Sequence, residues 1–513
     1  MNGAECLLQS LVSHSVKVCF MNPGTSEMQF VSALDRVPSM RGVLCLHETV
    51  CAGAADGYAR IARRPAATLL HLGPGLANGL SNFHNARKAR SPIVNIVGEH
   101  STAHLAYDAP LTADIDAIAR SVSGWTGTAK TPAEIGPLAA ECIAAALAPP
   151  GQVATLIVPA DVSWMDGANL VDKRSVAALE AVQEETLEKA CEWLSMGPRC
   201  GLLLSGRALL EGALSAAQHI QSATGVRVFA NRYAARLPRG LGGFNPQRLP
   251  YFPEPAEQAL SGIERLILVE CEPPVSFFGY PGRRSTLAPE NCEFMTLASE
   301  TQDARAALQS LAERLGPAEV PDPQNHRPTL PTDGALTPDS IGQTLAALLP
   351  EGAIVSDEMI SSGEAVNAWL LRAERHDLLP VTGGSIGQGL PVALGAALAA
   401  PDRKVVALQA DGSGMYSLQA LWTMARENLD VLVVVFANRR YRILDVEMQR
   451  TGAGPIGWKA DRMLDLSGPE LDWVALARGH GVEAVRAESL PEFTAFVMSA
   501  FNRRGPFLIE AVI

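Results

Sequence analysis

Residues 405–441, VVALQADGSGMYSLQALWTMARENLDVLVVVFANRRY, decide the fold. An apolar, partly β-branched run predicts a strand that ends at Asp411-Gly412-Ser413, and VLVVVFAN predicts a second strand that ends at Asn438. Between the two strands, the spacing of SLQALWTMAREN predicts a helix that crosses back over the sheet. Two strands joined in this way run parallel. Asp411 and Asn438 are therefore expected at one carboxyl edge, where open α/β sheets bind ligands.

The residue types at this edge suit Mg²⁺ and a diphosphate. A carboxylate and an amide are hard oxygen donors, and Mg²⁺ is usually held by a few such ligands together with phosphate oxygens. Gly412 permits a close backbone approach, and Ser413 could donate a hydrogen bond to a diphosphate at a helix N-terminus. The alternative is an ordinary strand–turn–helix in which Asp411 and Ser413 only cap the helix, and the tetrapeptide ADGS alone favours that alternative.

Length and composition restrict the class of protein. The chain has 513 residues, 47% apolar and 19% charged, which favours about three domains with large cores. A net charge of −12 and a pI near 5.4 disfavour nucleic acid or a membrane surface as the main partner. Nine scattered cysteines without a CxxC pair argue against a disulfide framework or a zinc site. Without a recognisable signal peptide or membrane span, a cytoplasmic protein is expected.

Short apolar runs alternate with Ala-rich helical stretches along most of the chain. This alternation predicts an α/β fold with parallel sheets, divided into three α/β domains. A stretch rich in Pro, Asp and Gly, with little periodicity, predicts a linker before the last domain. The predicted boundaries are 1–165 for the first domain, 174–318 for the central domain, 319–336 for the linker and 337–513 for the last domain.

Glu48 is a second candidate functional residue. It lies in GVLCLHETVCAGAADGYAR, where a predicted strand meets an apolar helix. A carboxylate flanked by Leu46, Val50 and Ala52 is costly to desolvate, which is typical of a functional group. The alternative is an acid at a helix N-terminus that interacts with the helix dipole, and residue type alone favours this alternative.

Four motifs occur in a fixed order: NPGTSE at 22–27, HET at 47–49, GGSIGQGLP at 383–391, and ADGS…AN from 410 to 438. In this order they resemble thiamine-diphosphate-dependent enzymes, especially benzoylformate decarboxylase and the large subunit of acetolactate synthase. The resemblance covers nearly the whole chain. It implies the thiamine-diphosphate-binding fold, with pyrimidine-binding, central and diphosphate-binding domains in that order.

The chain departs from the GDG…NN signature of these enzymes at small residues. Ala410 replaces the first Gly, and Ala437 replaces the first Asn. Neither position is an expected metal ligand. A Gly that is usual after the Asn pair is Arg442 in this chain, which affects the expected shape of the loop.

The resemblance implies roles for individual residues. Glu48 would hydrogen-bond the pyrimidine nitrogen of the cofactor and assist removal of the thiazolium proton. Asp411, Asn438 and the backbone carbonyl of Arg440 would bind Mg²⁺. The other implied residues face the cofactor or the substrate: Gly384, Ile386, Gly412, Ser413 and Tyr441 on the cofactor side, and Ser26 and His71 on the substrate side.

Several of these residues also have a structural interpretation. Ser26 could cap a helix, and His71 at a strand end could be a hydrogen-bonded structural histidine. Gly384 and Ile386 could belong to a Gly-rich turn with a core isoleucine. The loop PPVSFFGYPG at 273–282 contains no histidine, unlike benzoylformate decarboxylase. Five further side chains could face either substrate or solvent: Glu99, His100, Ile443, Leu444 and Glu447.

The implied reaction depends on thiamine diphosphate and Mg²⁺. A 2-oxo acid would be decarboxylated to an enamine intermediate, which is protonated to an aldehyde or ligated to a second carbonyl. FAD is not expected, because the segment GLLLSGRALLEG lacks the GxGxxG spacing of a dinucleotide site. The alternatives are 2-hydroxyacyl-CoA cleavage and a catalytically silent homologue. The resemblance also implies sites between subunits, and hence a homodimer or homotetramer.

Overall fold

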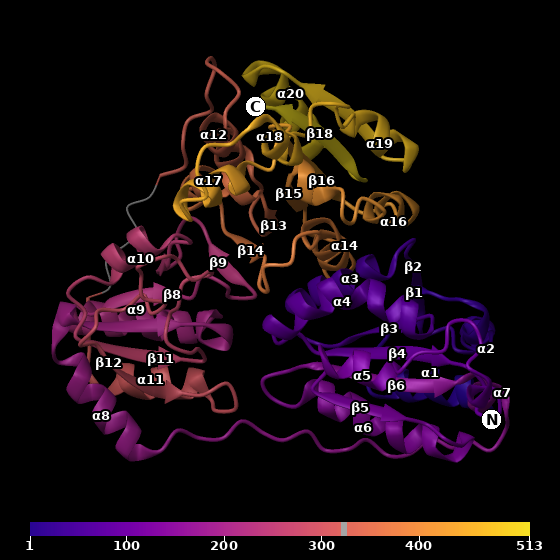
Figure 1. Ribbon diagram of the computed structural model, residues 1–513. Coiled ribbons are helices and arrows are strands. Elements are labelled where there is room, and N and C mark those ends of the chain that lie inside the picture. Colours follow the sequence, from indigo (N-terminus) through magenta and orange to yellow (C-terminus); the bar gives the residue numbers. More distant parts are fainter. Residues whose placement is uncertain (320–325) are drawn as a thin grey trace.

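The structure is a computed structural model that describes residues 1–319 and 326–513. These residues form three α/β domains, each built around its own sheet (Figure 1). The predicted linker at 319–336 falls partly on residues outside the described ranges, and the predicted domain boundaries stay predictions. No helix within the described ranges has the length and apolarity needed to span a membrane.

The first domain has a fully parallel sheet in the order β2-β1-β3-β4-β6-β5. Its strands are β1 (Val18–Asn22), β2 (Arg41–Leu44), β3 (Ala66–Leu70), β4 (Ile93–Glu99), β5 (Trp125–Thr128) and β6 (Val153–Pro159). Its helices are α1 (Gly3–Ser13), α2 (Met28–Ala33), α3 (Glu48–Ala62), α4 (Leu72–Lys88), α5 (Ile115–Arg120), α6 (Ile135–Leu147) and α7 (Ala160–Trp164). The strand predicted for VATLIVPADV ends at Pro159, because the chain turns into α7 there.

The middle domain has a second parallel sheet in the order β10-β8-β7-β11-β12. Its strands are β7 (Cys200–Leu204), β8 (Arg227–Ala230), β10 (Gln247–Arg248), β11 (Arg265–Val269) and β12 (Glu293–Ala298). The helices around it are α8 (Glu184–Leu194), α9 (Ala213–Thr224), α10 (Pro253–Leu260) and α11 (Ala304–Arg314). An extended segment connects α7 to α8 along one side of the molecule (Figure 1).

The third sheet has the order β17-β18-β16-β15-β13-β14-β9. Its strands are β9 (Leu237–Arg239), β13 (Ala353–Glu358), β14 (His376–Pro380), β15 (Val405–Ala410), β16 (Val431–Ala437), β17 (Glu483–Ala487) and β18 (Phe507–Val512). The edge strand β9 comes from the stretch predicted to form the central domain, and it pairs antiparallel with β14. The middle and last parts of the chain are therefore joined by backbone hydrogen bonds.

Nine helices among the described residues accompany this sheet. They are α12 (Pro338–Leu348), α13 (Gly363–Leu370), α14 (Gly389–Ala399), α15 (Asp411–Gly414), α16 (Ala420–Arg426), α17 (Arg442–Arg450), α18 (Trp458–Leu464), α19 (Trp473–Gly479) and α20 (Leu490–Phe501). The helix predicted for SLQALWTMAREN is present as α16 but is shorter at both ends. It connects two adjacent parallel strands, β15 and β16, as expected from the crossover.

A close helix crossing joins the first and third domains. Helix α3 packs against α14, and both are almost entirely buried. A Cβ atom on Gly57 would overlap the carbonyl oxygen of Val392, and one on Gly395 would overlap the carbonyl oxygen of Ala54. Glycine at these positions lets the two backbones touch. The apolar core of the first sheet consequently continues into the third domain without interruption.

Replacing Gly395 by Ala tests this crossing. The added methyl group would force the two backbones apart, and we expect a loss of about 1–3 kcal/mol in the free energy of unfolding. Denaturant titration followed by far-UV circular dichroism measures the change. Gly479→Ala is the matched control, because Gly479 is helical and exposed and has no atom within 4 Å of the added group. Equal stability of the two variants would contradict the tight crossing.

Candidate active site

Asp411 and Asn438 lie next to each other at the carboxyl edge of the third sheet. They directly follow β15 and β16, whose last paired residues are Ala410 and Phe436. The backbone N–H of Arg439 donates to Oδ2 of Asp411 at 2.6 Å, and the N–H of Gly412 donates to Oδ1 at 2.8 Å. Burial raises the pKa of the Asp411 carboxyl, while these backbone donors oppose the rise. The predicted adjacency of the two strand ends is present in the structure.

The turn after Asn438 supplies further oxygen atoms. Oδ1 of Asn438 accepts from the N–H of Arg440 at 3.0 Å, and Arg439 has a left-handed backbone with φ of 57°. The carbonyl of Arg440 accepts from the N–H of Arg442 at 2.8 Å and keeps a second lone pair. One carboxylate, one amide and one carbonyl form a set of hard oxygen donors that fits Mg²⁺. The described residues contain no cluster of three His, Cys, Asp or Glu that could hold a metal ion.

Gly412, Ser413 and Tyr441 surround the same turn. A Cβ atom on Gly412 would lie 2.5 Å from Cε1 of Tyr441, so the tyrosine ring packs directly on this glycine. The Ser413 hydroxyl donates to the Ala410 carbonyl at 3.3 Å and accepts from a side-chain amide at 2.6 Å. Ala410 is the N-cap of α15, and neither Asp411 nor Ser413 is. The capping alternative is therefore wrong for both residues.

Glu48 is the first residue of α3 and is 7% exposed. Its Oε2 accepts a hydrogen bond from Nδ2 of Asn78 at 3.0 Å. A Cβ atom on Gly75 would lie 3.2 Å from Oε1, so the first turns of α4 close over the carboxylate. His47, rather than Glu48, is the N-cap of α3. The residue types around Asn78 give no signal of this contact in the sequence.

The Gly-rich loop that precedes α14 is held by a buried carboxylate. Glu358, at the end of β13, accepts from the N–H of Gly387 at 2.5 Å and also from the N–H of Gly389. Burial raises the pKa of Glu358 to about 7. Gly384 has a φ of 80°, which favours glycine, and Ile386 is half-buried rather than part of the core. Sequence reasoning missed Glu358, whose partners lie about thirty positions away.

One side chain joins this loop to the Glu48 helix. Nδ2 of Asn82 donates to the carbonyl of Thr49 at 2.9 Å and lies 3.1 Å from the carbonyl of Gly387. Asn82 is buried. Asn82 therefore connects the first turn of the Glu48 helix to the Gly-rich loop of the same chain.

His71 pairs with a carboxylate that sequence reasoning missed. Oε2 of Glu27 lies 2.8 Å from Nδ1 of His71 and accepts from the N–H of Gly24 at 2.7 Å. Glu27 is fully buried, and its Oε1 has no partner among the described residues. Burial raises the pKa of Glu27, and His71 opposes the rise. Ser26 is half-buried next to this pair. It is not a helix cap, because Gly24 and Glu27 occupy the cap positions.

Among the side chains whose role the sequence left open, Glu99 and His100 lie at the end of β4, and Glu447 lies on α17. Glu99 is buried at the end of β4 and accepts from the N–H of His100 at 2.7 Å, and burial raises its pKa. Nε2 of His100 lies 3.0 Å from the carbonyl of Pro110. Glu447 is half-buried on α17 and accepts from the hydroxyl of Tyr280 at 3.1 Å. Glu447 is therefore not a freely solvated side chain.

The histidine-free loop at 273–282 contributes aromatic side chains. The ring of Phe277 lies directly against Gly384 and contacts the rings of Tyr233, Tyr251 and Phe278. This loop, from the middle domain, thus forms an aromatic wall beside the Gly-rich loop of the third domain.

Comparisons with known proteins agree with this arrangement of the chain. The family model "Thiamine pyrophosphate enzyme, N-terminal TPP binding domain" matches residues 1–119, and the corresponding C-terminal TPP binding domain matches residues 362–511. The "Putative acetolactate synthase large subunit IlvX" of Mycobacterium tuberculosis H37Rv is 48% identical over 100% of this chain and 99% of its own length. Benzoylformate decarboxylase of Pseudomonas aeruginosa is 28% identical over 97% of this chain and 96% of its own.

A solved structure shows the same fold. The thiamine diphosphate-dependent 4-hydroxybenzoylformate decarboxylase of Rhodococcus jostii RHA1 superimposes with a TM-score of 0.86 at 23% identity, covering 99% of this chain and 98% of that one. Both family models match in chain order, on the domains that carry Glu48 and Asp411. The chain belongs to the family of thiamine-pyrophosphate-dependent enzymes.

Proposed function

We propose that this enzyme decarboxylates a 2-oxo acid and depends on Mg²⁺ as well as thiamine diphosphate. The observation that carries the proposal is the buried carboxylate of Asp411, which has backbone amides as its partners and adjoins Asn438. A buried carboxylate without a cationic partner is costly, and a divalent cation would offset that cost. Asp411, Asn438 and the carbonyl of Arg440 would hold the Mg²⁺ ion.

Bound thiamine diphosphate would supply the electron sink that decarboxylation of a 2-oxo acid requires. Gly412 and Tyr441 would lie along the diphosphate, and the Ser413 hydroxyl would support their turn. The carbonyl of Gly384 would accept from the exocyclic amine of the pyrimidine, and Ile386 would press against the ring. These contacts would fix the position of the reacting carbon and would lower the entropic part of the barrier.

Glu48 would hold and exchange a proton at its carboxylate. Among the described residues this carboxylate has one neutral donor, Asn78, which orients it without neutralising it. On the substrate side, Ser26 and His71 would contact the carboxylate or carbonyl of the 2-oxo acid. Glu27 would orient His71 by binding Nδ1, which leaves Nε2 to deliver a proton to the product.

Two outcomes are possible after CO₂ leaves. Protonation would release an aldehyde, and attack on a second carbonyl would give a ligated product. We favour aldehyde release, because the His71–Glu27 pair provides a proton donor at the predicted substrate side. Carboligation is the second candidate, since the 48% identical relative bears the name of an acetolactate synthase subunit.

The primary experiment measures CO₂ release from a panel of 2-oxo acids, including pyruvate and benzoylformate, by a coupled assay. We expect release that needs both thiamine diphosphate and Mg²⁺ and that stops when EDTA removes the metal. Chromatography of the products separates aldehyde from ligated product. Release of no CO₂ from any acid, despite measured cofactor binding, would contradict the proposal and favour cleavage of a 2-hydroxyacyl-CoA.

Replacing Glu48 by Gln tests the proton-transfer role. The amide keeps the shape and the contact with Asn78 but does not exchange a proton in the same way, so we expect kcat to fall by about 10²- to 10⁴-fold. Thiamine diphosphate affinity, measured by calorimetry, should change much less. Glu188→Gln on the exposed face of α8 is the matched control and should leave kcat unchanged. Unchanged turnover in Glu48→Gln would rule the role out.

We also propose that the enzyme is at least a homodimer whose sites combine residues of two subunits, and that it works in the cytoplasm. Glu48→Gln and Asp411→Ala chains, each inactive alone, can be coexpressed with different tags. Each mixed dimer would contain one site with both residues intact. Because half of randomly formed dimers are mixed, we expect about a quarter of the wild-type activity. Purified mixed dimers without activity would contradict shared sites.

A further inference from the structure

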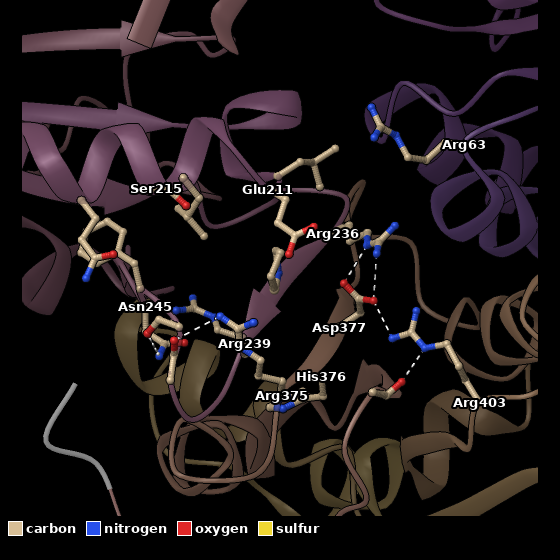
Figure 2. Close-up of a pocket in the computed structure, with 18 residues that line it drawn as sticks. Arg63, Glu211, Ser215, Arg236, Arg239, Asn245, Arg375, His376, Asp377 and Arg403 are labelled. Atoms are coloured by element: carbon tan, nitrogen blue, oxygen red, sulfur yellow. Dashed lines mark hydrogen bonds and ion pairs between the residues drawn. The ribbon is translucent and has the colours of Figure 1, made fainter. Parts of the chain in front are cut away.

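A cavity of about 490 Å³ lies where the three domains meet. Its walls come from the end of α3, the start of α9, the strand β9 with the loop after it, and the strand β14 (Figure 2). None of the proposed cofactor, metal or substrate residues lines it. The volume is within the range of sites that bind small molecules.

The cavity is strongly basic although the chain carries a net charge of −12. Its lining includes two carboxylates, Asp377 and Glu211, and five arginines: Arg63, Arg236, Arg239, Arg375 and Arg403. Burial lowers the pKa of His376 in the same wall to about 4, so this histidine is neutral at pH 7. Five guanidinium groups against two carboxylates leave an excess of three positive charges.

One carboxylate is shared by two of the arginines. Nε of Arg236 donates to Asp377 at 2.7 Å, and Arg403 donates to it from another side at 2.6 Å. Figure 2 shows Asp377 between these two guanidinium groups. Arg236 comes from the segment leading into β9 and Arg403 precedes β15. A single charge therefore compensates two cations contributed by different parts of the chain.

Arg239 is the buried member of the five arginines. It is 8% exposed, and its guanidinium donates to the carbonyl of Pro246 at 2.9 Å. Within residues 1–319 and 326–513, no carboxylate lies within ion-pair distance of it. Burial lowers the pKa of Arg239 to about 10. A buried cation without an anionic partner costs free energy, which an anion in the cavity would offset.

Arg63 and Arg375 complete the basic wall from its exposed side. Arg63 extends from the end of α3, in the first domain (Figure 2). Arg375 precedes β14 and donates to the carbonyl of Gly242 at 3.1 Å. Both residues are exposed, so their charges are accessible to a ligand that enters from solvent.

We propose that this cavity binds a small phosphate ester carrying at least two negative charges. Planar guanidinium forks match phosphate oxygens in geometry, and several arginines can share one phosphate. A ligand with one carboxylate would compensate only one of the three excess positive charges. The cavity is also larger than inorganic phosphate alone would fill. A bound ester would contact all three domains at once and would stabilise their packing.

The test uses the holoenzyme with saturating thiamine diphosphate and Mg²⁺, so that the cofactor site is already filled. Isothermal titration calorimetry at low ionic strength measures binding of three probes: inorganic phosphate, fructose 1,6-bisphosphate and ADP. We expect saturable binding of at least one ester, tighter than inorganic phosphate, and a rise in Tm on binding. The ester with the lower Kd shows whether the cavity prefers a sugar phosphate or a nucleotide.

The variant Arg63→Gln/Arg375→Gln locates the binding. Both side chains are exposed, so the fold should persist, and an unchanged Tm without ligand verifies this. We expect the Kd of the ester to rise at least about tenfold. Arg199→Gln/Arg504→Gln removes the same charge from exposed positions outside the cavity and should leave the Kd unchanged. Binding of no probe, or equal weakening in both double variants, would overturn the proposal.

Discussion

The crossing of α3 and α14 is the contact on which the rest of the structure depends. It is possible only because Gly57 and Gly395 let backbone touch backbone. Helix α3 begins at Glu48, and α14 begins directly after the Gly-rich loop that contains Gly384. Under the proposed sharing of sites between subunits, a shift in this one contact would move the Glu48 half of one cofactor site and the Gly-rich half of another. Asn82 strengthens the same connection with hydrogen bonds to both sides.

Buried carboxylates are a common feature of the sheet edges around the site. Asp411, Glu358 and Glu27 are each buried, and burial raises the pKa of each. Each carboxylate accepts a hydrogen bond from a backbone N–H group, which partly offsets the free-energy cost of burying its charge. Such buried carboxylates lower the stability of the folded protein, and under the proposed function they would prepare positions for a cation, a cofactor or a proton. The arginine-lined cavity has the opposite charge and lies apart from these edges.

The sequence predicted the parts of the structure that depend on local order. Adjacent parallel strands follow from a strand–helix–strand pattern, so the neighbouring positions of Asp411 and Asn438 could be foreseen. Strand β9 has three residues and pairs with a strand far along the chain, so no local pattern indicates it. Glu27 resembles an ordinary acid in a first helical turn, and its contact with His71 exists only after folding. The arginines that line the cavity come from distant parts of the sequence and form no motif that could be recognised before folding.

Under the proposed function, Glu48 and the Asp411–Asn438 edge together would hold one cofactor. An experimental structure with thiamine diphosphate and Mg²⁺ tests it most directly. We expect a metal ion bound by Asp411, Asn438 and the carbonyl of Arg440, with a Glu48 carboxylate within hydrogen-bond distance of the pyrimidine ring. A metal bound by other residues, or a pyrimidine ring out of reach of every Glu48 in the assembly, would contradict it.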